Sequence, residues 1–596
     1  MKKTILLLAC STLLLVACDS QNNTARSEGT ANQDFRATET AEDVTVIADD
    51  YINAMADVHP LYLVATGLAA DYGISNTAFE DISPEATARF EAAEDQLLSR
   101  INMVDPDNIE NRNDWVLHQS LKETLEASIQ MRVCKTPLWS LNHMSGWQNS
   151  LGQIVPLQPV STAEERTDAL ERWAKLPAYL AHDRANLEAG LAQGYSAPKR
   201  VVARVIKQLD IALATPPAES PFIGFIKNAE DAPEFSSAAE RLVIDKLNPA
   251  IASYRAFLND TYMPAARDAL AVTALPDGDA CYEAFLRLFH GANIGSKATF
   301  ENGQKAVAAN MAGLLDRGEE VFGTRDLGEI LAQVKDAPGN RFETEEELIS
   351  FTRDQVAHTR EKSEPFFSAL PEQEMVVEPY PDYLKGTGQS SRYEPTEAEK
   401  GPATYRINTD DWAEQTRGEA MVVVVHEGWP GHHLQLATFT EKGDLHPAMK
   451  LLGSSAAVEG WARYAEALAE EAGIYHNVYG EITRRAWPAR GMVGDPGLHA
   501  YGWTNEETAA YFIETGNFNE ETAEVLLDRM AVIPGQLTGY DTGGLEIFAL
   551  RREAEERLGD RFDIRAFHDH VLEVGMAPIS VIRANVEAWI EEEAAQ

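Results

Sequence analysis

Residues 197–214 read APKRVVARVIKQLDIALA, and their apolar side chains recur at intervals of three and four residues. This spacing places Val201, Val205 and Leu209 on one face of an α-helix. Residues 163–175 and 177–192 carry the same pattern, and proline and glycine separate the three stretches. Because such apolar faces are buried when helices pack against one another, the sequence predicts a mainly α-helical fold.

The helical pattern covers two long regions with a different pattern between them. Residues 41–370 form an N-terminal helical region, and residues 412–596 form a C-terminal helical region. The intervening residues 371–411 contain short extended segments among proline and glycine, such as ATYRIN at 403–408. We therefore expect a large multi-helix protein with a small β element before the second helical region.

The charge of the chain argues against nucleic acids and anionic lipid surfaces as its main partners. The 596 residues include 51 Lys and Arg against 94 Asp and Glu, which gives a formal net charge of −43. Nucleic acids and anionic lipid surfaces attract proteins through clustered basic residues. We therefore expect no nucleic-acid partner, and we interpret the acidity as that of a well-solvated surface.

The first residues resemble the export signal of bacterial lipoproteins. Residues 1–17 read MKKTILLLACSTLLLVA, in which two Lys precede an apolar run that is too short to count as a spanning helix. The sequence Leu15-Val16-Ala17-Cys18 resembles the lipobox, where cleavage precedes a cysteine that becomes lipidated. An ordinary secretory signal cut elsewhere is the alternative.

The lipoprotein reading predicts where the protein resides. Residues 1–17 are then the signal peptide, Cys18 is the lipidated N-terminus, and the polar residues 18–40 form a flexible tether. We expect a protein of the bacterial cell envelope that faces the periplasm or the exterior and touches the membrane only through its lipid anchor.

Two cysteines remain once residues 1–17 are removed and Cys18 is lipidated. Cys134 and Cys281 form either a disulfide, which an oxidising exported compartment permits, or a pair of buried thiols. Spacing in the sequence leaves both alternatives open.

One cluster of side chains is a candidate metal site. Residues 421–436 read MVVVVHEGWPGHHLQL, and His426, Glu427, His432 and His433 lie within eight positions of a chain with only 14 His. In a helical His-Glu-x-x-His motif, the two imidazoles bind zinc and the glutamate acts on a bound water. A polar loop with hydrogen-bonded imidazoles, or a buried strand at the valine run, is the alternative.

The spacing of the histidines requires a break in the helix. On an unbroken helix His426 and His432 would point about 240° apart, and His433 would lie about 10 Å along the axis from His426. Zn–N bonds of about 2.0–2.1 Å cannot span such a gap. Residues that release or interrupt the helical backbone stand between them: Gly428, Pro430 and Gly431.

A candidate third ligand follows 26 residues after His433. Residues 459–466 read EGWARYAE, in which Glu459, Arg463 and Glu466 share one face of a helix. The separation allows one helix to end and a second to pack antiparallel to it. The alternative is an exposed Glu459 paired with Arg463.

The motifs together resemble a known family. The string HEGWPGHH at 426–433, followed by EGWA at 459–462, resembles the bacterial domain of unknown function 885 family, and weaker segments match in order, including 405–409, 497–503 and 534–536. The similarity extends from about residue 41 to about residue 590. That family resembles the gluzincin-type zinc metallopeptidases, which implies a metallopeptidase-like helical fold with an active-site groove.

The resemblance also implies a set of metal ligands and a base. In the related peptidases a glycine precedes the second ligating histidine, and His432 follows Gly431. The implied ligands of a zinc ion are therefore His426, His432 and Glu459, with His433 as the alternative ligand. Glu427 would be the general base.

Three further residues are candidates for binding the substrate or stabilising charge. Tyr540 is the first choice for stabilising the oxyanion and His499 is the second, and each also fits a purely structural role. Arg490 could receive a peptide carboxylate, although a surface arginine is the simpler interpretation.

Two functions from different classes are consistent with these residues. The first is an envelope-anchored metallopeptidase that hydrolyses short peptides through a zinc-activated water. The second is a lipoprotein that binds peptides or partners and retains a structural or vestigial metal site.

Overall fold

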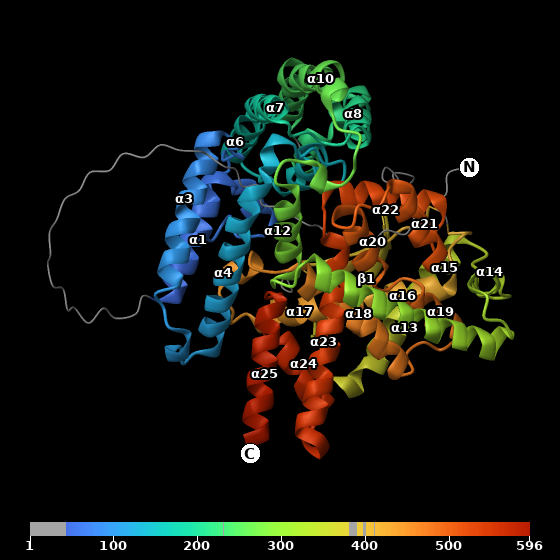
Figure 1. The fold of residues 1–596 in the computed structure, drawn as a ribbon. Helices are drawn as coiled ribbons and strands as arrows, with labels where there is room; N and C mark the ends of the chain where they lie inside the picture. The colour runs from blue at the N-terminus through green and yellow to red at the C-terminus, as the bar shows by residue number, and fades with distance from the viewer. Residues whose placement is uncertain (1–42, 230–231, 381–389, 397–400, 411, 596) are drawn as a thin grey trace. The chain divides into compact units, whose positions relative to one another are not determined.

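The computed structural model describes residues 43–229, 232–380, 390–396, 401–410 and 412–595 (Figure 1). The predicted signal peptide, Cys18 and the tether lie outside the described residues. The described chain forms two compact units, one of residues 43–284 with 446–451 and the other of residues 285–445 with 452–595. Helices dominate both units, which confirms the predicted mainly α fold class.

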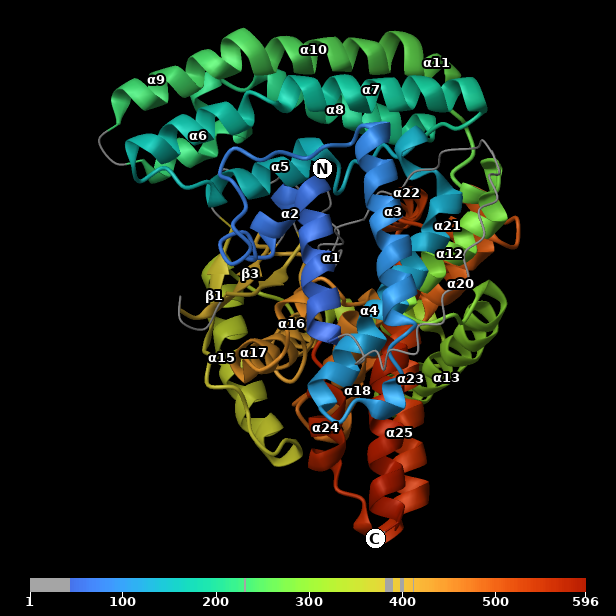
Figure 2. The same ribbon diagram turned by 90° about the vertical axis from the view of Figure 1, so that its left-hand side faces the viewer.

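The N-terminal unit is built from helices whose buried faces follow the sequence pattern. On α8 the buried positions include Val201, Val205 and Leu209, the predicted apolar face. Helix α10 packs against both α7 and α8, and the three run alongside one another (Figure 2). The helices of this unit are α1 (Val44–Val58), α2 (Pro60–Ala65), α3 (Pro84–Ile101), α4 (Arg112–Met131), α5 (Trp147–Ile154), α6 (Ala163–Trp173), α7 (Leu176–Gln193), α8 (Lys199–Ala214), α9 (Pro233–Leu242), α10 (Asn248–Phe257) and α11 (Met263–Ala265).

A disulfide joins two distant segments of the N-terminal unit. Cys134, just after α4, is bonded to Cys281 on α12 (Gly278–His290), with 4.6 Å between the Cα atoms. Both residues are buried. Of the two alternatives that the sequence left open, the structure has the bridge.

Removing this disulfide is expected to destabilise the protein. The bridge closes a loop of 147 residues. Closing a loop of that size lowers the conformational entropy of the unfolded chain and so raises the free energy of the unfolded state by about 3–5 kcal/mol. The double variant Cys134→Ser/Cys281→Ser should therefore unfold at a clearly lower denaturant concentration than the wild type under non-reducing conditions. Reductant should lower the wild-type midpoint and leave that of the double variant unchanged. Equal midpoints for both proteins without reductant would contradict the prediction.

The C-terminal unit holds the remaining helices and a small sheet. The chain enters it within α12, after Ala284. Its further helices are α13 (Ser296–Phe322), α14 (Leu327–Asp336), α15 (Glu345–Ser363), α16 (Arg417–Glu427), α17 (His432–Lys442), α18 (Ser455–Glu471), α19 (Val478–Arg485), α20 (Arg490–His499), α21 (Asn505–Thr515), α22 (Glu520–Val532), α23 (Gln536–Leu558), α24 (Ile564–Leu572) and α25 (Ile579–Ala595).

The sheet supplies the β element that was predicted before the motif. Its strands are β1 (Met375–Pro379), β2 (Arg392–Glu394) and β3 (Ala403–Ile407), in the order β1-β3-β2. β1 is parallel to β3, whereas β2 is antiparallel to it, with Tyr393 opposite Tyr405. The short strand β2 therefore lies at an edge of the sheet.

Helices α18 and α23 cross at very close range because both carry glycine at the crossing. A Cβ atom added to Gly460 would lie 2.4 Å from the Cα of Gly543, and one added to Gly543 would lie 1.8 Å from the carbonyl oxygen of Ala456. Such distances leave no room for any side chain. The close crossing brings together the helix that carries Glu459 and the helix that carries Tyr540.

None of the helices in the described part of the chain combines the length and the apolar character that crossing a bilayer requires.

Candidate metal centre

Helix α16 places His426 and Glu427 in its last turn. Thr416 and Glu419 form a capping box that fixes the start of the helix. The valines at 422–425 are buried within this helix, so the alternative of a buried strand at this run is wrong.

The helix is interrupted between His426 and His432, as the spacing of these residues required. Gly428 ends α16 and Gly431 precedes α17, both in backbone conformations outside the helical region. A Cβ atom on Gly431 would lie 2.1 Å from the carbonyl oxygen of His426, so only glycine fits this turn. His432 then begins α17 with its ring centroid 4.6 Å from that of His426.

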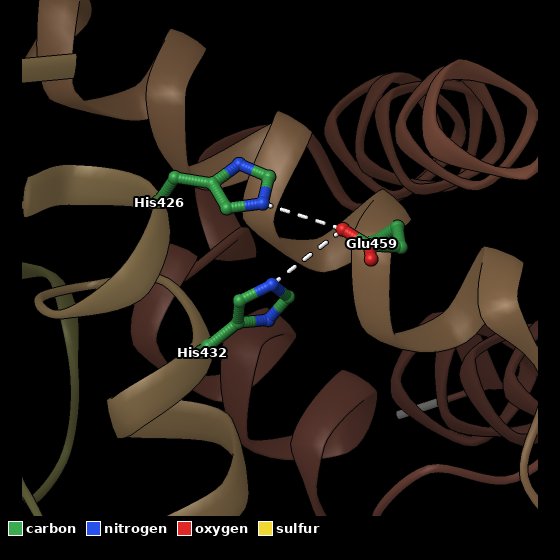
Figure 3. A group of neighbouring side chains, drawn as sticks. All are labelled: His426, His432 and Glu459. Carbon is green, nitrogen blue, oxygen red and sulfur yellow. Dashed lines mark hydrogen bonds and ion pairs between the residues drawn. The ribbon is translucent and has the colours of Figure 1, made fainter. Parts of the chain in front are cut away.

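Helix α18 brings Glu459 to the same point. Its Oε2 lies 3.3 Å from His426 Nε2 and 3.5 Å from His432 Nε2 (Figure 3). Two hydrogen bonds hold α18 against the break and α17: Trp461 Nε1 donates to the carbonyl of Pro430 (2.9 Å), and Gln435 Nε2 donates to that of Ala457 (3.1 Å).

The three side chains have donor atoms and a spacing that suit a metal ion. Their ligand atoms all lie within 4.8 Å of one another, and the exposed fractions are 1% for His426, 4% for His432 and 1% for Glu459. Ligand atoms bonded to a tetrahedral zinc are about 3.3 Å apart, close to the two distances to Glu459. His432 Nδ1 and Glu459 Oε1 are buried without a hydrogen-bond partner. The donor set therefore fits a divalent metal ion.

The electrostatic surroundings favour a cation at this point. Burial acts to raise the pKa of Glu459, but hydrogen bonds from His426 and His432 hold it well below its usual range. Burial acts to lower the pKa of His426, yet the hydrogen bonds to Glu459 and Glu466 raise it to about 9. The carboxylates of Glu459 and Glu466 therefore stabilise a positive charge at this point, whether it is a proton on His426 or a metal ion.

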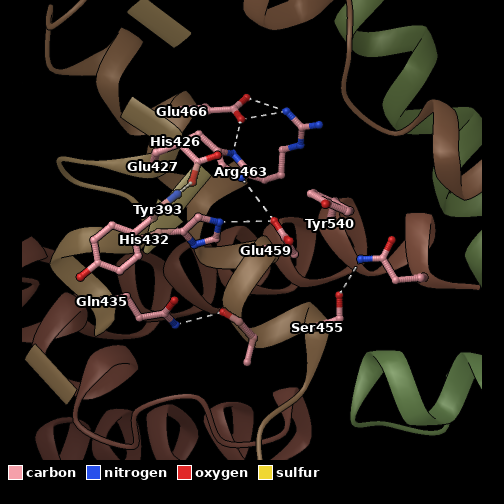
Figure 4. Close-up of polar contacts among 12 residues, drawn as sticks. Tyr393, His426, Glu427, His432, Gln435, Ser455, Glu459, Arg463, Glu466 and Tyr540 are labelled. Carbon is pink, nitrogen blue, oxygen red and sulfur yellow. Dashed lines mark hydrogen bonds and ion pairs between the residues drawn. The ribbon is translucent and has the colours of Figure 1, made fainter. Parts of the chain in front are cut away.

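Two residues outside the group fix the orientation of His426. Its Nδ1 lies 2.8 Å from Glu466 Oε1, and Arg463 Nη1 donates to both oxygens of Glu466 at 2.8 and 2.9 Å (Figure 4). The sequence places Glu466 on the same helical face as Glu459 but does not indicate a role for it. A carboxylate on the far nitrogen of a ligating imidazole sets the tautomer and the ring orientation. The interpretation of Glu459 as an exposed partner of Arg463 is wrong.

Glu427 lies beside the group and not within it. Its Oε2 accepts a hydrogen bond from the backbone N–H of Tyr393 on β2 (2.8 Å). Burial raises the pKa of Glu427, and the nearby His432 and His426 oppose that rise. Its carboxylate thus differs from that of Glu459, whose pKa is lowered.

His433 has separate partners. Its Nε2 lies 3.0 Å from the carbonyl oxygen of Gln373 and its Nδ1 lies 3.2 Å from the hydroxyl of Tyr393. Burial lowers the pKa of His433 to about 4. The structure thus brings His432, and not His433, to the group that contains His426 and Glu459.

The remaining predicted residues lie in different surroundings. The Tyr540 ring stacks on that of His426 with 6.3 Å between centroids, and its hydroxyl accepts a hydrogen bond from Arg529 (3.0 Å). His499 is buried on α20 with its Nε2 3.1 Å from the carbonyl oxygen of Met530, and it does not belong to the three-residue group. Arg490 is fully buried, so its interpretation as a surface arginine is wrong.

The fold is shared with two solved structures. A candidate lipoprotein of Colwellia psychrerythraea superimposes with a TM-score of 0.84 at 23% identity, over 93% of this chain and 100% of that one. A candidate lipoprotein of unknown function from Shewanella oneidensis does so with a TM-score of 0.74 at 17% identity, over 91% and 99%. At these identities the likeness shows the fold alone.

The family follows from the sequence itself. No curated protein matches the chain. One family model matches residues 60–586, which span both compact units and include every residue of the candidate metal centre. The chain therefore belongs to the family described as bacterial protein of unknown function, DUF885.

Proposed function

We propose that this protein is a metal-dependent peptidase that hydrolyses short peptides and that His426, His432 and Glu459 hold a zinc ion. The observation that carries the proposal is the convergence of two imidazoles and a carboxylate within 4.8 Å, all buried, with a further carboxylate at Glu427 beside them. The string HEGWPGHH resembles the DUF885 family, and the resemblance of that family to gluzincin-type peptidases supports the same reaction and implies a groove that admits short chains.

Each residue has a separate part in the proposed hydrolysis. Zinc, when bound, supplies a Lewis acid that lowers the pKa of a water toward about 7. Glu427 takes the proton of the attacking water and delivers it to the leaving amine, a task that suits a buried carboxylate with a raised pKa. Tyr540, whose hydroxyl is held by Arg529, stabilises the negative charge that develops on the carbonyl oxygen.

A non-catalytic role is the second candidate, and one observation favours it. His426, His432 and Glu459 are almost completely buried. Structural zinc sites are closed in this way, whereas catalytic sites keep one position open to water and substrate. On this alternative the protein is a lipoprotein that binds peptides or partners, and the metal stabilises its fold.

Metal content and hydrolysis distinguish the two candidates. Protein purified without chelator should contain about one zinc ion per chain by mass spectrometry of its metals, because each chain has one such group among the residues described. A panel of short peptides should be cleaved, chelator should stop cleavage, and added zinc should restore it. Zinc bound without cleavage of any peptide would favour the structural role. Protein that binds no divalent metal would contradict both.

We also propose that the mature chain is anchored to the cell envelope by lipid on Cys18. The Leu15–Cys18 sequence supports this, and the two solved neighbours are themselves candidate lipoproteins. Mass spectrometry of protein extracted from membranes should find a diacylated Cys18 as the first residue. An unmodified Cys18, or cleavage at another position, would contradict the anchor.

A further inference from the structure

A cavity in the C-terminal unit is separated from the candidate metal centre by the ring of one side chain, Tyr540. Tyr540 stacks on His426 and also lines this cavity. The cavity has a volume of about 60 Å³, several times the roughly 10–15 Å³ that one water molecule requires. The cavity therefore has room for part of a ligand next to the metal centre.

Arg490 places a buried positive charge in the wall of this cavity. It is 0% exposed. Its guanidinium donates only to backbone carbonyls, those of Arg485, Pro488 and Thr515, and no carboxylate of the described chain forms an ion pair with it. Burial lowers the pKa of Arg490 to about 10. Asp541 in the same wall attracts Arg490 electrostatically but forms no ion pair with it. Because a buried charge without a close counter-ion is costly, this wall favours an anionic ligand.

Arg463 adds a second guanidinium with donors to spare. Its Nη1 binds Glu466, but its Nε is buried and has no hydrogen-bond partner. The guanidinium carbons of Arg463 and Arg529 lie 5.5 and 5.6 Å from the centroid of the Tyr540 ring. The cavity wall also contains one carboxyl group, that of Asp541; burial raises its pKa, and the attraction of Arg463 and Arg490 opposes that rise. Three guanidinium groups and one carboxyl group line this wall, so its balance of charge is positive.

The rest of the cavity is apolar. Its other walls include the aromatic rings of Trp487, Phe512 and Phe518 and the side chains of Leu526 and Leu537. An inorganic anion would leave these groups unused. A ligand that joins a carboxylate to a bulky apolar group would match both parts of the wall.

We propose that this cavity binds the C-terminal residue of a short peptide, its free carboxylate toward the arginines and its apolar side chain against the aromatic wall. The proposal rests on the proposed peptidase function and makes the enzyme an exopeptidase that releases a C-terminal fragment. In the reaction one water is consumed: the scissile C–N bond breaks, a C–O bond forms, and a proton passes to the amine of the released fragment.

The first test compares three peptides that differ only at the C-terminus. A peptide that ends in phenylalanine as the free acid should be cleaved with a kcat/KM about 10- to 100-fold higher than its C-terminal amide, mainly through KM, because charge-assisted hydrogen bonds to the carboxylate are lost. An amidated peptide that ends in glutamate tests a side-chain carboxylate and should be as poor as the amide. Equal cleavage of acid and amide would overturn the proposal and leave the peptidase function intact.

The second test measures binding without turnover. N-acetyl-phenylalanine should bind to the Glu427→Gln protein in calorimetry, and its amide should bind at least about 10-fold more weakly. Leu526→Trp, which fills the cavity, should abolish this binding, whereas the matched control Glu521→Trp on the exposed side of α22 should retain it. Binding that is unchanged by Leu526→Trp would overturn the assignment of the cavity. If the wild-type protein hydrolysed no peptide while the Glu427→Gln protein bound N-acetyl-phenylalanine, that result would count against the peptidase function alone.

Discussion

Replacing Glu427 by glutamine is expected to reduce the kcat of peptide hydrolysis by about 10²- to 10⁴-fold, the range typical of a lost general base. The amide preserves the size of the side chain and can still accept the hydrogen bond from the backbone N–H of Tyr393. It cannot accept a proton from water at neutral pH. The loss should therefore fall on kcat, with little change in the free energy of unfolding.

Zinc content separates a lost base from a lost ligand. The Glu427→Gln protein should retain zinc at the wild-type stoichiometry, because Glu427 lies outside the group formed by His426, His432 and Glu459. The exposed Glu556→Gln on α23 is the matched control and should retain full activity. A Glu427→Gln protein that has lost its zinc would make Glu427 a ligand or a support of the site, and one with wild-type turnover would show that Glu427 is not the base.

The helices were predictable wherever local pattern determines them. The apolar spacing of residues 163–175, 177–192 and 197–214 is a property of each segment alone, and the structure has α6, α7 and α8 at these places within two residues at each end. The division into two compact units was not predictable in this way. It depends on which helices contact each other over long sequence separations, and the unit boundary falls inside α12.

In the candidate site, too, features set by local sequence were predictable and features set by helix packing were not. The break between His426 and His432 followed from the helix geometry together with Pro430 and Gly431, because spacing along a helix is fixed by its pitch. The contact of Glu466 with His426 was not predicted, although its helical face was known, because it depends on how α18 packs beside α16. Arg490 was assigned to the surface for a similar reason: arginine is usually exposed, and only the packed structure reveals its burial.

The adjacent histidines provide the most direct test of the metal centre, because their side chains have different partners although the residues are consecutive. His432→Gln should lower the affinity for zinc by at least about 100-fold, more than the 10- to 100-fold typical of a lost outer-shell residue. His433→Gln should keep zinc, because His433 is engaged with Gln373 and Tyr393. Glutamine at both positions keeps a polar side chain, so the pair is matched.

The readout that best isolates metal binding is the change in Tm on adding zinc. A ligand at about 100 times its Kd stabilises the folded state by about 2.7 kcal/mol, so zinc should raise the Tm of the wild type and of His433→Gln by similar amounts. The Tm of His432→Gln should not respond at the same zinc concentration. His433→Gln should have a lower starting Tm, because it replaces a buried imidazole with two partners, but this loss is independent of zinc. If His433→Gln lost the zinc response and His432→Gln kept it, the second histidine ligand would be His433. Helix α17 would then have to begin differently in the metal-bound protein, because the His433 side chain contacts Gln373 and Tyr393 in this structure.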